Sequence, residues 1–281
     1  ILDDLSHYQS YQTTGCSLHD DICPHSGDYR FIRTDICNRQ AVEKLFQEVQ
    51  PDVVINTSAL SVPDYCETHH AEADAVNITA VENLAECCEA GGSRFIHLST
   101  DFVFGGDTDR PYTEEDIPAP VNYYGYTKLE GEKRIAAVCK DYAIVRVVVV
   151  YGASLPGQHG NVLQLVANRL RNNEEVFVVS DQWRTPTFVG DVSQGVEKLI
   201  NHPQNGIYHL CGSECLTIAD IAYWVADVLG LNRSLIRPVT TKEMNEKTPR
   251  PRFSGLSIEK VRRELGYRPH TLEEGIKLMF G

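Results

Sequence analysis

SRFIHLSTDFVFGG, residues 93–106, is the stretch that decides the fold. It begins with an apolar run that ends on the hydroxyl side chains of Ser99 and Thr100. A continuous apolar run of this length is typical of a β-strand that is buried on both faces. Two other segments share the pattern, PDVVINTSAL at residues 51–60 and YAIVRVVVVYG at residues 142–152. We therefore expect three strands of one buried sheet.

Helical patterns separate these strands along the chain. One covers residues 38–49, with Asn38 as its N-cap, a second covers residues 69–92 and closes on two glycines, and a third covers residues 122–138. Strands that alternate with helices form a parallel sheet with helices on its faces. The predicted fold class is α/β, a Rossmann-like doubly wound parallel sheet.

A smaller second domain is expected after residue 150, where a glycine-rich loop and a new helix change the texture of the sequence. The segment of about 178–213 is expected to form a helix and a strand that return to the first sheet. The expected first domain is residues 1–150 plus about 178–213. The expected second domain is a discontinuous C-terminal α/β unit of about 151–177 plus 214–281.

Composition excludes several functional classes. The formal net charge of −13 argues against nucleic acid or an anionic membrane as a partner, because both favour a basic surface. The longest apolar run, near Arg146, is shorter than the roughly 20 residues that cross a bilayer. The first residues lack a secretory signal pattern, and nine scattered cysteines fit a reducing compartment. We expect a cytoplasmic protein with no membrane and no nucleic-acid partner.

Basic residues gather late in the chain. Residues 231–270 hold ten Lys or Arg against four Glu. Within them, the segment TPRPRFSGLS carries Arg250 and Arg252 in a proline-punctuated loop, where guanidinium groups could bind a phosphate in a bidentate manner. The alternative is that both arginines are simply solvated.

Polar residues follow each predicted strand, as NTSALS, STD and YGASLPGQHGN. Ligands of parallel sheets bind beyond the carboxyl ends of the strands, so these residues predict a binding cleft. Each segment taken alone could instead cap a helix or close a turn.

Tyr124 and Lys128 lie four residues apart, so a helix presents both side chains to one place. A phenol is a poor acid at neutral pH unless a cation stabilises its anion, and we expect Lys128 to supply that cation. A Tyr and a Lys four residues apart are common by chance, so this spacing predicts a site only together with other residues nearby. Thr100, at a strand end, could bind the same carbonyl oxygen that Tyr124 protonates. Together they predict a site that moves a hydride onto a carbonyl.

These motifs resemble those of the extended short-chain dehydrogenase/reductases, and within them the dTDP-4-dehydrorhamnose reductase family. The segments VPDYCE, VNITAVENLA, STDFVFGG, YYGYTKLEGE, DQWRTPT and SGLS occur in order over essentially the whole chain. The resemblance implies NADP or NAD bound to the first domain. It also implies a nucleotide-diphosphate 4-keto-6-deoxysugar as the substrate, bound by the second domain and reduced at its C4 ketone.

The resemblance also implies roles for single residues. Thr100, Tyr124 and Lys128 match the catalytic triad, with Tyr124 as the proton donor and Lys128 holding the nicotinamide ribose. The residues that match the family's cofactor cleft are Asp35, Ile36, Ser58, Ala59, Leu60, Ser61, Asn77, Tyr124 and Lys128. Two alternatives stay open: that Asp35 caps the next helix, and that Asn77 is a solvated helix residue.

Substrate contacts follow from the same resemblance. The residues expected there are Thr100, Asp101, Val149, Arg250 and Arg252. Asp101 would bind sugar hydroxyls, and the two arginines would hold the diphosphate. Val149 stands where the family has a tryptophan against the sugar, and a valine cannot stack, so the identity of the hexose stays open. No metal is expected.

The glycine-rich turn that joins the first strand to the first helix of such folds is absent from this sequence. ILDDLSHY resembles the tail of the helix that follows it. We expect roughly 15 to 20 further residues before Ile1, enough for one strand and a turn. Ser17 and His19 precede Asp20 without an arginine, and the resemblance favours NADP over NAD.

Three functional alternatives remain. A nucleotide-sugar epimerase shares the fold, and so does a dehydratase, although Phe102 stands where a dehydratase needs a second acid. A third reading is a non-catalytic NADP-binding regulatory subunit, because the methionine adenosyltransferase β subunit resembles the same branch. A homodimer is the expected assembly.

Overall fold

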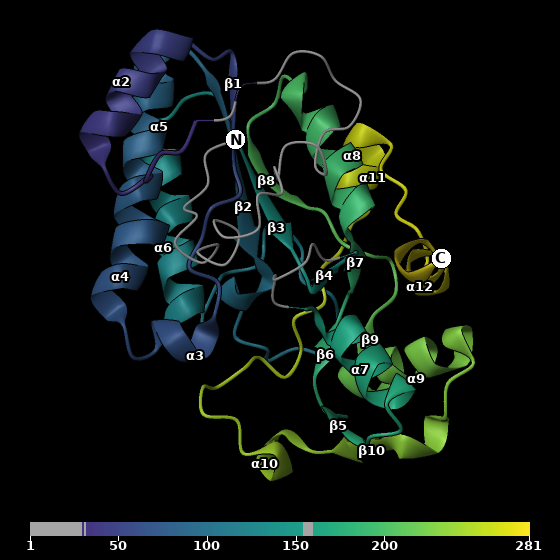
Figure 1. Ribbon diagram of the computed structural model, residues 1–281. Coiled ribbons are helices and arrows are strands. Elements are labelled where there is room, and N and C mark those ends of the chain that lie inside the picture. Colours follow the sequence, from purple (N-terminus) through teal and green to yellow (C-terminus); the bar gives the residue numbers. More distant parts are fainter. Residues whose placement is uncertain (1–29, 31, 154–159) are drawn as a thin grey trace.

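The computed structural model describes residues 30, 32–153 and 160–281, and its centre is a parallel sheet (Figure 1). The strand order is β1-β2-β3-β8, and every neighbouring pair is parallel. These strands are β1 (Val53–Asn56), β2 (Arg94–Thr100), β3 (Tyr142–Val147) and β8 (Gly206–His209). The three strands expected from the sequence are thus adjacent in the sheet, and the fourth comes from the segment expected to return to it.

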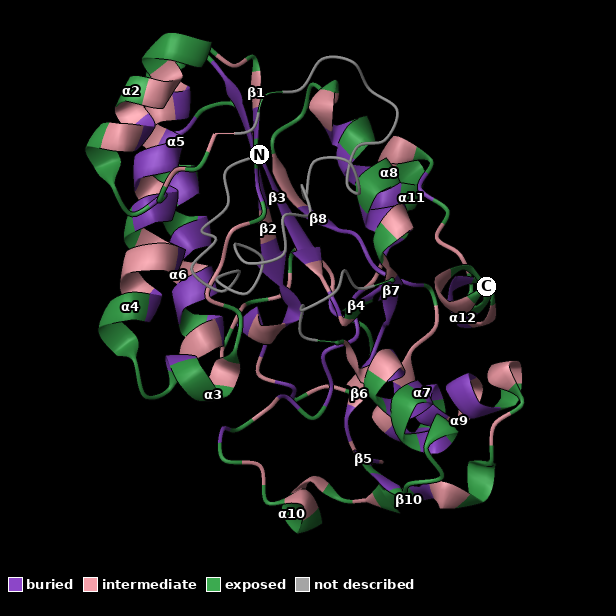
Figure 2. Ribbon diagram, in the orientation of Figure 1, coloured by how far each residue is buried: buried purple, intermediate pink, exposed green. Residues whose placement is uncertain are grey.

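Helices cover both faces of this sheet. On one side lie α2 (Arg39–Val49), α5 (Ala80–Gly91) and α6 (Tyr123–Val138), and on the other lie α8 (Val189–Ile200) and α11 (Glu259–Leu265) (Figure 1). Asn38 caps α2 by accepting a hydrogen bond from the backbone of Ala41, as predicted. The doubly wound α/β fold is confirmed. The central strands β2 and β3 are almost wholly buried between the helix layers, whereas Ile55 in β1 is 42% exposed (Figure 2).

The predicted helix over residues 69–92 is a composite. It consists of α4 (His70–Asp74), a π-helical turn (Ala75–Thr79) and α5, whose C-cap Gly92 adopts the left-handed conformation. The short helix α3 (Pro63–Cys66) precedes it. A π-helical turn carries one extra residue and redirects the side chains that follow, and such turns are frequent at functional sites.

A second core lies beside the sheet. It is built from α7 (Val162–Arg171), α9 (Ile218–Leu229) and α12 (Leu272–Phe280), together with the parallel pair β5 (Val176–Val179) and β10 (Ile236–Val239). The remaining elements are β4 (Val150–Tyr151) paired with β7 (Thr187–Phe188), β6 (Trp183–Arg184) paired with β9 (Leu216–Thr217), the 3-10 turns Asp101–Val103 and Arg233–Leu235, and α10 (Thr241–Met244).

The division into two domains stays a prediction, and the two cores place two segments across its boundaries. Val178 packs in the second core with β10, although about 178 was the expected return to the first domain. Val261 and Tyr267 pack in the first core, although both fall in the expected second domain. These residues pack outside their expected domains because segments far apart in the sequence pair with each other, and local periodicity does not encode such pairing. Among the described residues, no helix is long and apolar enough to cross a membrane.

Candidate functional site

The carboxyl ends of β1, β2 and β3 meet at one edge of the sheet, because the three strands are neighbours and parallel. β1 ends at Asn56 and β2 ends at Thr100. The polar segments that follow them therefore lie at the same edge, where parallel sheets bind ligands.

Helix α6 brings Tyr124 to this edge. Asn122 caps the helix by accepting a hydrogen bond from the backbone of Gly125 at 2.8 Å. A Cβ atom on Gly125 would lie 2.1 Å from the carbonyl oxygen of Phe102, so only glycine allows the helix to start this close to the end of β2. The Tyr124 phenol is thereby brought close enough to the Thr100 hydroxyl for that hydroxyl to influence its pKa.

Tyr124 keeps its proton at neutral pH. Burial raises the pKa of the phenol above its ordinary value, and the Asp101 carboxylate and the Cys66 thiol act in the same direction, while the hydrogen bond with Thr100 opposes them. The sequence predicted that Lys128 would make this phenol more acidic. Lys128 is not among the groups that shift the pKa of Tyr124 in the described structure, and its role toward the phenol stays a prediction.

Lys128 is 1% exposed and faces β2. Its Nζ donates to the carbonyl oxygen of Leu98 at 2.7 Å and lies 3.0 Å from Nε2 of His97. Burial lowers the pKa of Lys128 to about 8, and the nearby Glu132 carboxylate partly offsets this. The four-residue spacing correctly places both residues on α6, but it could not reveal that His97 and the β2 backbone take the hydrogen bonds of Lys128 Nζ.

Asn77 fixes the loop that follows β1. It is fully buried in the π-helical turn, so the reading of a solvated helix residue is wrong. Its Oδ1 accepts from the Leu60 backbone N–H at 2.9 Å, and its Nδ2 donates to the Leu60 carbonyl at 3.0 Å and to Thr127 Oγ1 at 3.0 Å. A Cβ on Gly131 would meet the Asn77 carbonyl oxygen at 2.6 Å, so α6 packs closely on this turn. Asn77 thus ties the loop of Ser58 to the helix of Tyr124.

The other residues predicted to contact the cofactor fall into two groups. Ser58, Ala59 and Leu60 are half-buried and Ser61 is exposed, all directly after β1. Asp35 accepts a hydrogen bond from the Cys37 backbone at 2.8 Å in the turn before α2, which agrees with the local, capping alternative for this residue. Ile36 beside it is 1% exposed. Ser17, His19 and Asp20 lie outside the described residues.

Asp101 is 4% exposed, and protein groups engage both of its carboxylate oxygens. Oδ1 accepts from Thr100 Oγ1 at 3.1 Å, Oδ2 accepts from Ser254 Oγ, and Nε of Arg184 lies 3.9 Å from Oδ2. Burial raises the pKa of Asp101, and Arg184 and the two hydroxyls oppose that shift. The sequence predicted that Asp101 binds sugar hydroxyls. In the structure its carboxylate already contacts Thr100, Ser254 and Arg184, so a sugar hydroxyl would have to share or replace one of these contacts.

The two arginines of the basic loop are also paired. Nε of Arg250 lies 3.1 Å from Oε1 of Glu246, and Nη2 of Arg252 donates to the Thr108 carbonyl at 3.1 Å. Arg252 lies over the Trp183 ring, 5.4 Å from its centroid. Burial lowers the pKa of Arg184, and Arg250 contributes to that lowering, so Arg250 lies near the Asp101 cluster.

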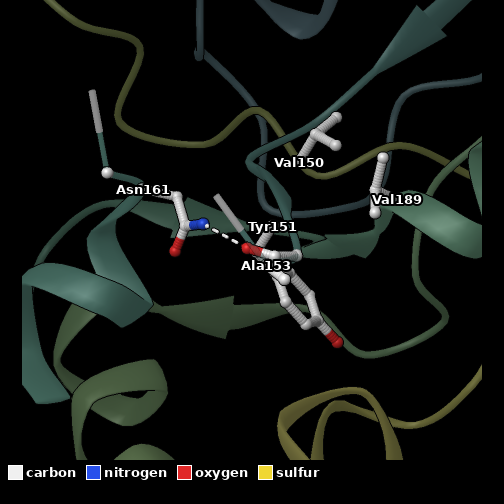
Figure 3. A pocket seen from close by; sticks show the side chains of 7 residues that line it. Val150, Tyr151, Ala153, Asn161 and Val189 are labelled. Carbon is white, nitrogen blue, oxygen red and sulfur yellow. Dashed lines mark hydrogen bonds between the residues drawn. The ribbon is translucent and has the colours of Figure 1, made fainter. Parts of the chain in front are cut away.

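Val149 directly precedes Val150 and Tyr151, which line an open pocket of about 240 Å³ (Figure 3). Its backbone has φ of 38°, a left-handed conformation that is strained for a β-branched residue. The pocket is lined by Val150, Tyr151, Gly152, Ala153, Gly160, Asn161 and Val189. Asn161 donates to the Gly152 carbonyl at 3.2 Å across it. Sequence reasoning named the glycine-rich segment but not these lining residues.

The sequence analysis did not predict a role for several residues of the site. Arg184 and Ser254 stood in quoted motifs, DQWRTPT and SGLS, but neither was given a role. His97 and Asn56 lie on strands that were recognised, and a polar residue at a strand position expected to be buried was the available signal.

Comparisons with known proteins agree with this geometry. The chain is 33% identical over 274 residues to the probable low-salt glycan biosynthesis reductase Agl14 of Haloferax volcanii, covering 96% of this chain and 86% of that protein. It is 35% identical over 237 residues to methionine adenosyltransferase 2 subunit beta of Xenopus laevis, covering 83% and 70%.

The crystal structure of dTDP-4-dehydrorhamnose reductase from Bacillus anthracis in complex with NADP superposes with a TM-score of 0.85 at 27% identity, covering 93% of this chain and 92% of that chain. The resemblance predicted from the sequence is therefore confirmed. The family model described as RmlD substrate binding domain matches residues 6–281, and the chain belongs to this family.

Proposed function

We propose that the protein is an NAD(P)H-dependent reductase of a nucleotide-diphosphate 4-keto-6-deoxysugar, similar to dTDP-4-dehydrorhamnose reductase. The observation that carries the proposal is the proximity of the Tyr124 phenol and the Thr100 hydroxyl at the carboxyl edge of the sheet. A protonated phenol beside a hydroxyl offers two donors to one carbonyl oxygen once Thr100 Oγ1 turns its proton from Asp101 Oδ1 to the ketone, and two such donors favour the reduction of a ketone.

The residues at this edge fit a nicotinamide cofactor, which supplies a hydride when bound. Lys128 offers a buried donor for ribose hydroxyls one helical turn from Tyr124, and Asn77 holds the loop of Ser58 in a fixed position. The Bacillus anthracis relative is in complex with NADP, which supports NADP as the first choice and NAD as the second.

Tyr124 would deliver the proton. Because its pKa is raised, the phenol stays protonated until negative charge develops on the ketone oxygen. Thr100 would hold the same oxygen and fix its direction. This mechanism differs from the expectation drawn from the sequence, since it uses a phenol that keeps its proton in place of one acidified by Lys128.

Substrate binding is proposed at the pocket beside Val149, with Asp101 near the sugar and with Arg250 and Arg252 toward the diphosphate. The position of the pocket directly after β3, beyond the carboxyl end of a sheet strand, supports this placement. For the arginines the proposal requires that Glu246 and the Thr108 carbonyl give up their contacts to phosphate oxygens, which guanidinium groups bind in a bidentate manner.

The test is steady-state oxidation of NADPH and of NADH by the purified protein with dTDP-4-dehydrorhamnose. Tyr124→Phe should lose about two to four orders of magnitude in kcat, the usual contribution of a positioned acid. Tyr126→Phe is the matched control, because Tyr126 lies on the same helix and is 43% exposed. Equal losses in both variants would contradict the role of Tyr124.

A second candidate is a non-catalytic NADP-binding subunit, which the 35% identity to methionine adenosyltransferase 2 subunit beta favours. Tight binding of NADPH without oxidation of it, together with retention on a methionine adenosyltransferase column, would support this candidate over the reductase.

The nine cysteines support a cytoplasmic location, and a homodimer stays a prediction that light scattering can test.

A further inference from the structure

A line of hydrogen bonds connects Lys128 to the loop after β1. Nζ of Lys128 lies 3.0 Å from His97 Nε2, His97 Nδ1 lies 3.0 Å from Asn56 Nδ2, and Asn56 Oδ1 accepts from the backbone N–H of Ser58 at 3.0 Å. The three side chains are 1%, 0% and 4% exposed, in that order. Water therefore does not compete for these bonds.

The backbone end of the line fixes the direction of every bond. An N–H group can only donate, so Asn56 must turn Oδ1 toward Ser58 and its NH₂ group toward His97. Nδ1 of His97 then accepts, and the single proton of the neutral ring lies on Nε2. That proton points at Lys128, whose Nζ must accept it. A nitrogen that accepts a hydrogen bond is a neutral amine.

An ammonium at Lys128 demands the opposite arrangement. It can only donate, so Nε2 of His97 would accept and the ring proton would move to Nδ1. Asn56 would have to rotate its amide to present Oδ1 to His97. Its NH₂ group would then face the N–H of Ser58, donor against donor. Protonation of Lys128 therefore breaks the hydrogen bond from the Ser58 backbone N–H to Asn56 Oδ1.

The electrostatic surroundings agree with this bistable arrangement. Burial lowers the pKa of Lys128 to about 8 and holds the pKa of His97 well below its ordinary value, so His97 stays neutral while Lys128 titrates. Besides His97, the ionisable group that acts on Lys128 is Glu132, one turn further along α6, and Glu132 is itself paired with Arg146 on β3. Among the described residues, Glu132 is the group that favours the ammonium.

We propose that His97 and Asn56 are positioning residues that couple the charge of Lys128 to the backbone N–H of Ser58. Uptake of one proton from solvent converts the amine to an ammonium, moves the ring proton of His97 from Nε2 to Nδ1 and rotates Asn56. A cofactor atom that accepts a hydrogen bond from Ser58 lowers the cost of that rotation. By linkage, cofactor binding then favours the charged Lys128, and this last step rests on the proposed function.

The test is the tautomer of His97, read by ¹⁵N NMR of ring-labelled histidine between about pH 6 and 10, a range that spans the lowered pKa of a buried lysine. A His97→Gln variant assigns the signal. The wild-type protein should show the Nε2–H form above about pH 8 and the Nδ1–H form below it. A tautomer that does not change over this range overturns the proposal.

Asn56→Asp sharpens the test, because a carboxylate accepts from Ser58 and from Nδ1–H of His97 at the same time. This variant should keep the Nδ1–H form and shift the titration of Lys128 upward by at least about one pH unit. Asn232→Asp, an exposed cap of a short 3-10 turn, is the matched control and should behave as wild type. An Asn56→Asp spectrum identical to wild type would contradict the coupling.

Lys128→Met gives an independent check should Asn56→Asp fail to fold. Without Nζ no ammonium forms, so His97 should keep the Nε2–H tautomer throughout, and a persisting switch would exclude Lys128 as its cause. These measurements need neither cofactor nor turnover, so they can succeed where the reductase assay fails. Addition of NADPH should raise the pH of the switch, and an unchanged pH with bound NADPH overturns the link to Ser58.

Discussion

Ser254 donates a hydrogen bond to the buried carboxylate of Asp101, directly after Thr100, although 153 positions separate the two residues. Asp101 thereby links the end of β2 to the C-terminal part of the chain, with Arg184 as a third member. The position of the candidate acid site at Thr100 and Tyr124 therefore depends on a segment that is remote in the sequence.

Removal of the Ser254 hydroxyl should destabilise this joint. Ser254→Ala leaves a buried carboxylate with one partner fewer, and the expected loss is about 1–3 kcal/mol in the free energy of unfolding. Urea denaturation at neutral pH measures it. Ser193→Ala is the control, since that exposed hydroxyl bonds only to its own helix. A Ser254→Ala protein as stable as the control would show that Asp101 does not need this hydrogen bond.

Stability should rise with pH in the alkaline range because of Lys128. Its pKa is 10.5 when unfolded and about 8 when buried, so between these values the unfolded state binds more protons and the folded state gains relative stability as pH increases. The gain is at most about 3 kcal/mol. It is isolated as the difference in unfolding free energy between the wild type and Lys128→Met. A difference that is constant from pH 8 to 10.5 would refute the buried, lowered pKa.

The buried pair of Arg146 and Glu132 should be costly to break. Arg146 Nε and Nη2 donate to the Glu132 carboxylate at 2.9 and 2.6 Å, and both side chains are nearly inaccessible. Glu132→Leu leaves the guanidinium charge buried without its partner, with an expected loss of about 3–5 kcal/mol. Thermal or urea unfolding provides the measurement. Breaking the exposed pair of Arg262 and Glu259 by Glu259→Ala should change stability little, and similar effects in both variants would contradict the argument.

Gly125 should be indispensable to the acid site. In Gly125→Ala the new methyl group would lie 2.1 Å from the Phe102 carbonyl, so the start of α6 must move away from the end of β2. The Tyr124 and Thr100 hydroxyls would separate, and kcat should fall at least about tenfold while stability falls by about 1–3 kcal/mol. Gly91→Ala, whose Cβ meets only Ser93 Oγ at 3.4 Å, serves as the control. Retention of full activity in Gly125→Ala would show that this close approach is not required.

Much of the architecture could be predicted from local pattern. The alternation of apolar runs with amphipathic segments predicted the parallel sheet, the cap at Asn38 and the helix that carries Tyr124 and Lys128 on one face. These features depend on neighbours within a turn or a strand, and such neighbours are read directly from residue spacing.

The partners of each functional group could not be predicted in this way. Spacing suggested that Lys128 would act on Tyr124, whereas the fold gives its Nζ to His97 and Leu98 across the α6–β2 contact. The pairing of β5 with β10 and the burial of Asn77 against Leu60 were missed for the same reason.

The order of strands and helices, and which residues share a helix face, follow from the amino-acid sequence alone, because backbone geometry imposes fixed periods on side chains. The tertiary structure decided which protonation states those side chains adopt. Burial and hydrogen-bond partners set the pKa values of Tyr124, Lys128 and Asp101, and both arise only when segments far apart in the chain pack together.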